Sequence, residues 1–301
     1  MEPWWQKCEL LDLTYDIEGN SPYYPGTEVA GHLFNLTRVL DGTFPTDADG
    51  KKQLYVNINS FHTTEHWGTH MDAPRHVVKK EDNDGKRNSI EQVPLRGLVG
   101  EACVLDIPEA EKRNLQSNYA LTVEDVKAWE KENGDLHKDC VVVVRTGRGA
   151  HWGDVDEYLG VEKGKERKPE NLNFPGISVE AIVWIVKERG LKAVAVEAMS
   201  LDVGQTSNFY HSVHSVVLGS ANRPGIENLA NADKLPKRGA TIMMWPAKIK
   251  TGSGAFARIV AYGHKENDDC RLDATSGSRQ SATLYWVIAL LAGALLIGLL
   301  A

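Results

Sequence analysis

The sequence predicts an α/β fold with a mixed sheet, because short apolar segments of strand length alternate with two amphipathic helical segments. The chain has 301 residues, of which 42% are hydrophobic and 25% charged, so it is long enough to bury a large core. No internal repeat and no low-complexity block interrupts residues 1–270. We therefore expect a single domain over 1–270.

Six segments are expected to form strands. Residues 54–58 alternate apolar and polar side chains, as a half-buried strand does. The other five are apolar or alternating runs at 102–107, 141–144, 193–196, 241–245 and 255–262. Residues 20–50 and 145–175 are rich in Gly, Pro, Asp and Asn, so we expect long loops there, placed to cover a site.

Two segments between the strands carry helix start and stop signals. Thr122 is expected to cap the first helix, with Asp125 three residues later completing a capping box. Ser178 is expected to cap the second helix, which ends at Gly190. An apolar strand follows each helix within about ten residues, which is the order of elements in an α/β layer.

The acidic balance of the chain argues against nucleic acid as a partner. The formal net charge is -7 at pH 7 and the sequence pI is about 5.8. Phosphate binding needs a basic stripe, and the sequence contains none.

The cysteines leave the cellular compartment open. They stand alone, without a CxxC pair, which excludes a thiolate zinc knuckle. Their even number fits two disulfides in a secretory compartment, and four free thiols would fit the cytosol equally well. The four are Cys8, Cys103, Cys140 and Cys270.

The C-terminal residues 284–301 form an uncharged apolar run that follows a polar linker at 271–283. As a helix the run would extend about 27 Å, close to the hydrocarbon thickness of a bilayer. We expect a membrane anchor, in the first place a tail anchor with the folded domain in the cytosol. The alternative is a removable signal for a GPI anchor on an extracellular domain, although residues 1–20 hold no apolar signal core.

The densest chemistry lies at 66–76, where three of the ten histidines of the chain fall close to an aspartate. His66, His70, Asp72 and His76 all have even numbers, so an extended segment would direct the four side chains to one side. A glycine and a proline within the segment disfavour a regular helix. This combination predicts a metal site rather than a set of unrelated surface histidines.

Imidazole nitrogens and carboxylate oxygens are suitable ligands for zinc, manganese or iron. His66, His70 and Asp72 as three ligands would leave an open position for water, whose pKa a divalent ion lowers toward about 7. His76 has the intrinsic pKa that proton transfer requires. The segment is not the HExxH zinc motif, and no GxSxG elbow of a serine hydrolase is present.

The segment 66–76 reads HWGTHMDAPRH and resembles the HxGTHxDxPxH signature of the cyclase-like metal-dependent hydrolases, a family that includes kynurenine formamidases and isatin hydrolases. Residues 9–262 take part in this resemblance. Shorter segments that are similar to further motifs of the family lie at 11–14, 24–26, 200–202, 214–219 and 227–230.

The resemblance implies a swivelling β/β/α fold and a homodimer whose partner chain helps to line the pocket. It implies that His76 is the general acid and base. His211 competes with His214 as a ligand, and the apolar run after His214 favours the latter. The implied ligands of one or two zinc or manganese ions are His66, His70, Asp72, His214 and Glu227.

The resulting hypothesis is hydrolysis of a small aryl formamide, with N-formylkynurenine of tryptophan catabolism, the kynurenine pathway, as the favoured substrate. Trp67, Tyr23 and Tyr24 are expected to pack on the aryl ring, or else to belong to the core. Departures from the family pattern at Trp67, 212–213 and 221–225 leave the substrate open. The alternatives are a cyclic amide such as isatin, and a catalytically silent, membrane-tethered binding protein of the same fold.

Overall fold

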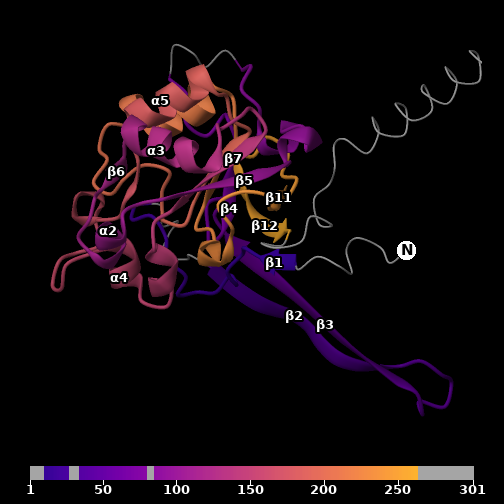
Figure 1. The fold of residues 1–301 in the computed structure, drawn as a ribbon. Coiled ribbons are helices and arrows are strands. Elements are labelled where there is room, and N and C mark those ends of the chain that lie inside the picture. The colour runs from indigo at the N-terminus through magenta and orange to yellow at the C-terminus, as the bar shows by residue number, and fades with distance from the viewer. Residues whose placement is uncertain (1–9, 27–33, 80–84, 264–301) are drawn as a thin grey trace, which may run out of the picture.

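The computed structural model describes residues 10–26, 34–79 and 85–263. This part of the chain is a single mixed α/β domain, as predicted, built on an eight-stranded sheet with the order β1-β12-β11-β5-β7-β9-β10-β4 (Figure 1). Because β4 also pairs with β12, seven of the strands close into a ring. The strands are β1 (Leu10–Asp12), β4 (His70–Asp72), β5 (Val99–Asp106), β7 (Cys140–Arg145), β9 (Ala193–Val196), β10 (Gly225–Glu227), β11 (Thr241–Pro246) and β12 (Gly254–Tyr262).

The centre of the sheet is parallel, since β5, β7, β9 and β10 run side by side in the same direction. Parallel strands are covered on both faces and read as continuous apolar runs. In β7, Val141 and Val143 belong to a core that holds side chains of all seven ring strands and so fills the ring. Val142 and Val144 belong to the second core, which the helices cover.

Helices α3 (Val123–Asn133) and α5 (Val179–Glu188) cover the outer face of the parallel strands (Figure 1). Thr122 and Asp125 form the predicted capping box of α3, and Ser178 caps α5, so both predicted helices are confirmed. The remaining short elements include α2 (Glu109–Arg113), α4 (Val155–Leu159), and strands β6 (Ala120–Leu121) and β8 (Gly176–Ile177), which pair with each other.

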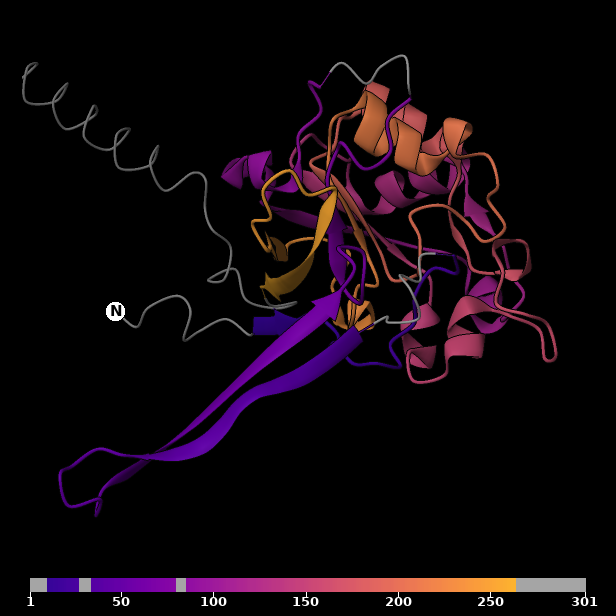
Figure 2. The same cartoon turned by 180° about the vertical axis from the view of Figure 1, so that it is seen from behind.

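A long hairpin of β2 (Phe34–Pro45) and β3 (Gln53–Thr63) projects away from the domain in both views (Figures 1 and 2). The predicted loop at 20–50 is therefore wrong over β2, and the predicted loop at 145–175 is wrong over α4. A bulge between Arg38 and Leu40 breaks the alternation of β2, which conceals the strand in the sequence.

One disulfide joins neighbouring parallel strands, between Cys103 of β5 and Cys140 of β7. Cys8 and Cys270 lie outside the described residues, as do the predicted linker at 271–283 and the predicted membrane segment at 284–301. Within the described part of the chain, none of the helices combines the length and the apolar character needed to cross a bilayer.

Candidate metal centre

Strand β4 carries two of the predicted ligands into the ring of strands. Its register with β10 places His70 opposite Glu227. Before β4, Gly68 has a φ of 60°, and after it the N–H of His76 closes a tight turn. The prediction of one extended segment over 66–76 is therefore wrong outside β4, because the chain bends on both sides of it. These bends still bring the two outer histidines to the same cavity.

Four buried side chains form the centre, and none is more than 7% exposed: His70, Asp72, His214 and Glu227. His70 Nε2 lies 3.2 Å from Asp72 Oδ1 and 3.4 Å from Glu227 Oε2. His214 Nε2 lies 3.1 Å from Glu227 Oε1 and 3.6 Å from Asp72 Oδ2. The two imidazoles and two carboxylates thus alternate in a closed ring of four ion pairs.

The two remaining histidines of the motif extend this centre toward the surface. His66 Nδ1 is 2.7 Å from Asp72 Oδ1, and the His66 side chain is 21% exposed. The ring of His76, which is exposed, stacks on that of His66 with centroids 3.9 Å apart. Ligand atoms of His66, Asp72 and His76 lie within 4.8 Å of one another. The predicted cluster of 66, 70, 72 and 76 is therefore one spatial group.

Asp202 positions His214, and sequence reasoning gave it no role. Its Oδ2 lies 2.6 Å from His214 Nδ1, and its Oδ1 accepts a hydrogen bond from the Val213 N–H at 2.5 Å. A carboxylate at Nδ1 fixes the tautomer that leaves Nε2 free for a ligand role. His211, the neighbour that competed with His214, does not line the cavity. The motif around Asp202 had pointed to this segment but not to the pairing with His214.

Ser253 and Glu65 hold His66 from the other side. Ser253 Oγ lies 3.0 Å from His66 Nε2 and donates a hydrogen bond to Glu65 Oε2 at 2.6 Å. The backbone N–H of Ser253 donates to the same carboxylate oxygen. No sequence signal links Ser253 to a histidine 187 positions away, because the contact arises only when β12 pairs with β4.

The centre opens into a cavity of about 470 Å³. Apolar side chains of Tyr24, Val77, Met199 and Phe209 line it beside the histidines. Of the three predicted aromatic contacts, only Tyr24 lines the cavity. Trp67 is 1% exposed and stacks on Tyr23 with centroids 5.5 Å apart. Trp67 therefore takes the alternative place, in the core, and neither it nor Tyr23 lines this cavity.

Opposite charges dominate the titration of the centre. Burial alone would lower the pKa of His70, but the carboxylates of Asp72 and Glu227 outweigh it and raise that pKa to about 10. The pKa of His214 is also raised well above its usual range, against burial, by its carboxylate partners. Burial would raise the pKa of Asp72 and Glu227, yet the imidazoles lower both.

His76 behaves differently from the buried histidines. Desolvation of its ring by the surrounding protein lowers the pKa of His76 to about 4, and the charge of Asp72 offsets this only in part. Its imidazole is therefore neutral at pH 7, which is the form that accepts a proton.

Two buried atoms of the centre make no hydrogen bond, namely His70 Nε2 and Asp72 Oδ2. An unpaired buried polar atom costs about 1–3 kcal/mol. Ligand atoms of His70, Asp72 and Glu227 lie within 4.8 Å of one another, and all are of the types that zinc and manganese take. The residues present therefore fit a divalent cation, which would satisfy both atoms.

The fold and this centre define the chain as an α/β protein with a histidine and carboxylate site at a closed mixed sheet. The Cyclase family model matches residues 11–203. The chain therefore belongs to the Cyclase family.

Comparisons with individual proteins agree with this family. An isatin hydrolase of Roseibium aggregatum is 30% identical over 200 residues, which is 65% of this chain and 71% of the relative. The structure of isatin hydrolase A from Ralstonia solanacearum superposes with a TM-score of 0.71 at 29% identity, covering 86% of this chain and 93% of that one. A structure described as a potential metal-dependent hydrolase with cyclase activity shares the fold, with a TM-score of 0.55 at 19% identity, and covers 85% of this chain and all of its own.

Proposed function

We propose that the protein is a metal-dependent hydrolase of small aryl amides, and that a cyclic amide such as isatin is its best-supported substrate. The observation that carries the proposal is the pair of unbonded ligand atoms, on His70 and Asp72, in a centre that opens into an apolar cavity. The relatives named isatin hydrolase favour the cyclic amide. An aryl formamide such as N-formylkynurenine is the second candidate, because it presents the same aryl ring and amide carbonyl.

In this proposal the buried side chains hold one or two ions. His66, His70 and Asp72 would bind the first, and His214 and Glu227 would bind a second that shares Asp72. A bound divalent ion would polarise the amide carbonyl and lower the pKa of water, so that hydroxide is available at neutral pH. Asp202 keeps His214 in the tautomer that this arrangement requires.

His76 is the proposed acid and base. Its neutral imidazole lies at the exposed side of the centre, stacked on His66, where substrate and water enter. It would take a proton from the attacking water and return it to the amide nitrogen as the carbon–nitrogen bond breaks. Hydrolysis of isatin would open its ring and give a single product that carries both the new amine and the new carboxylate. Hydrolysis of an aryl formamide would release two products, formate and an aniline.

The apolar wall of the cavity would orient the aryl ring. Val77, Met199 and Phe209 offer no charge to an aromatic ligand, and Phe209 also contacts His214 with centroids 5.9 Å apart. A ring packed there would place its amide carbonyl toward His70 and Asp72. Orientation by packing of this kind converts binding into a near-attack geometry.

The test is a side-by-side assay of isatin and N-formylkynurenine with the zinc-loaded and the manganese-loaded protein. We expect isatin to be hydrolysed faster than N-formylkynurenine. The His70→Ala variant should lose both the bound metal and the hydrolysis of isatin. The matched control is His151→Ala, which removes a histidine paired with Glu157 away from the cavity. A metal-loaded protein that hydrolyses neither compound would contradict the proposal, and so would full turnover in His70→Ala.

A homodimer is the second part of the proposal, and the hairpin supports it. Both faces of β2–β3 present apolar side chains to solvent, with Leu36 57%, Tyr55 61%, Ile58 50% and Phe61 54% exposed. Among the described residues, no strand outside the hairpin pairs with it. A two-stranded hairpin is marginally stable by itself, and apolar patches of this kind mark interfaces. We infer that a second copy of the chain covers it.

Light scattering after size-exclusion chromatography tests the dimer. The protein is expected at about twice the chain mass of 33.3 kDa. Ile58→Lys should shift it toward the single-chain mass, and Leu95→Lys, at an apolar side chain that is 75% exposed outside the hairpin, serves as the matched control. A wild-type protein that elutes as a single chain would contradict this part.

A further inference from the structure

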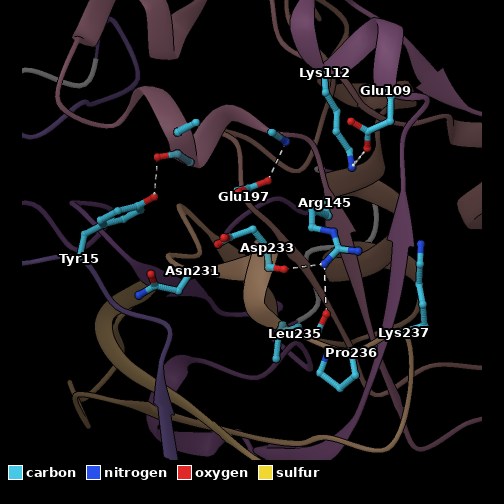
Figure 3. Close-up of a pocket in the computed structure, with 13 residues that line it drawn as sticks. Tyr15, Glu109, Lys112, Arg145, Glu197, Asn231, Asp233, Leu235, Pro236 and Lys237 are labelled. Carbon is cyan, nitrogen blue, oxygen red and sulfur yellow. Dashed lines mark hydrogen bonds and ion pairs between the residues drawn. The ribbon is translucent and has the colours of Figure 1, made fainter. Parts of the chain in front are cut away.

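A second cavity, of about 640 Å³, shares no lining residue with the metal centre in the described part of the chain (Figure 3). It lies where three parallel strands end: Asp106 ends β5, Arg145 ends β7, and Glu197 follows β9 directly. The carboxyl edge of parallel strands is the usual place for ligands in α/β proteins. Neither the metal centre nor its proposed chemistry uses this cavity.

One side of the cavity is acidic. Glu197 is 3% exposed, and its Oε2 accepts hydrogen bonds from the N–H groups of Thr146 (3.0 Å) and Gly147 (2.7 Å). Its Oε1 lies over Gly149, where an added Cβ would stand only 2.5 Å away. The side chain of Asp233 lines the same side (Figure 3).

No salt bridge between described residues involves the carboxylate of Glu197 or of Asp233. Arg145 approaches this side, but it donates to the main-chain carbonyls of Asp233 and Leu235 and to the carboxylate of Asp106. Burial raises the pKa of Glu197, and the N–H groups of Gly147 and Thr146 and the charge of Arg145 oppose this rise only in part. The acidic side therefore offers a buried carboxylate that Arg145 attracts from a distance and that no cationic side chain of the described residues contacts at salt-bridge distance.

The opposite side of the cavity is basic. Lys112, Arg145 and Lys237 all contact the single carboxylate of Asp106. Glu109 adds one further carboxylate, on Lys112 at 2.6 Å. Two lysines and an arginine thus gather beside two carboxylates at this side of the cavity.

We propose that this cavity is a binding site for a small zwitterion of the amino-acid class, with its ammonium on Glu197 and its carboxylate at Lys112 and Lys237. Each pole of such a ligand would meet side chains of the opposite charge. Tyr15, Leu235 and Pro236 give the cavity an apolar wall for the side chain of the ligand. An amine or a simple carboxylate would satisfy only one pole.

Three probes of matched size test the proposal by isothermal titration calorimetry with the full chain. L-norleucine carries both charges, n-pentylamine carries only the ammonium, and hexanoate carries only the carboxylate. We expect norleucine to bind at least about tenfold more tightly than either of the others, the ratio that about 1.4 kcal/mol of binding energy produces.

Two variants assign the binding to this cavity. Glu197→Gln keeps the shape and an oxygen for the two backbone donors, and Lys237→Met removes a cation whose side chain is 43% exposed. Each should weaken norleucine binding about tenfold or more. Glu180→Gln and Lys187→Met, both exposed on α5, are the charge-matched controls and should leave binding unchanged.

Several results would overturn the proposal. If norleucine at millimolar concentration gives no heat of binding, the site is rejected. Equal affinity for norleucine and pentylamine would show a cation site without a second pole. Wild-type affinity in both cavity variants would place the binding elsewhere. Lys237→Met keeps the test decisive even if Glu197→Gln does not fold.

Discussion

The metal centre and the cluster around Asp106 both shield carboxylates from solvent, fully at the centre and in part at Asp106, but they differ in the cations that neutralise them. At the metal centre the partners of Asp72 and Glu227 are imidazoles, which are positive only while they hold protons. At Asp106 the partners are two lysines and an arginine, which are positive at any physiological pH. The first arrangement can exchange protons for a metal ion, whereas the second is a permanent structural tie between strand ends.

The largest effect that would test this difference is expected in Asp72→Asn. Removing the charge shared by three histidines should abolish metal binding and lower turnover about 1000-fold or more, since the metal supplies the nucleophile. Metal analysis and steady-state hydrolysis measure both. Retained metal with retained turnover would show that Asp72 is no ligand.

Asp106→Asn should destabilise the fold and leave metal content unchanged. The carboxylate is 18% exposed, and its loss leaves three neighbouring cations without their common partner. We expect a loss of about 3 kcal/mol in the free energy of unfolding, measured by urea denaturation at pH 7. Asp156→Asn, in an exposed pair with Arg167, is the control and should cost less than about 1 kcal/mol. If Asp106→Asn and Asp156→Asn lowered the free energy of unfolding by the same small amount, Asp106 would not be the structural tie described above.

Asp202→Asn should weaken the metal centre without destroying it. An asparagine amide facing His214 Nδ1 favours the wrong tautomer, so the affinity for zinc should fall about 10–100-fold. Competition with a chromogenic chelator measures the affinity, and Asp135→Asn at an exposed position is the control. Unaltered affinity would mean that His214 takes no part in binding.

The two clusters should also fail at opposite ends of the pH range. Without metal, His70 has its pKa raised from 6.5 to about 10, so the stability that it contributes is complete below pH 6.5 and is lost as pH rises toward 10. Asp106 has its pKa lowered from 3.8, so its contribution is present above that pH and is lost on acidification.

Thermal melts of the metal-free protein between pH 2 and 10 would measure this smaller effect, and saturating zinc should remove the alkaline loss. An alkaline loss of the same size with and without zinc would contradict the assignment to His70.

The sequence predicted these regions unequally, for physical reasons. The apolar runs of β7 and β9 and the caps at Thr122 and Ser178 are local signals, and each gave the element that the structure contains. Strand β4 has three residues, too few for a periodicity, and it forms only because β10 and β12 pair with it.

The same distinction applies to the candidate site. The spacing of His66, His70 and Asp72 is visible in one stretch of chain, so the cluster was found. Ser253 reaches His66 through strand pairing, and Glu197 faces a cavity that exists only when three strand ends meet. Contacts between residues far apart in the chain leave no pattern in a single sequence.

The most direct measurement of the central claim is anomalous diffraction at the zinc absorption edge from crystals grown with zinc. The account predicts a peak at about 2.0–2.2 Å from His70 Nε2 and from a carboxylate oxygen of Asp72, with His66 rearranged toward it. No peak at this centre, or zinc bound only at surface histidines, would contradict it.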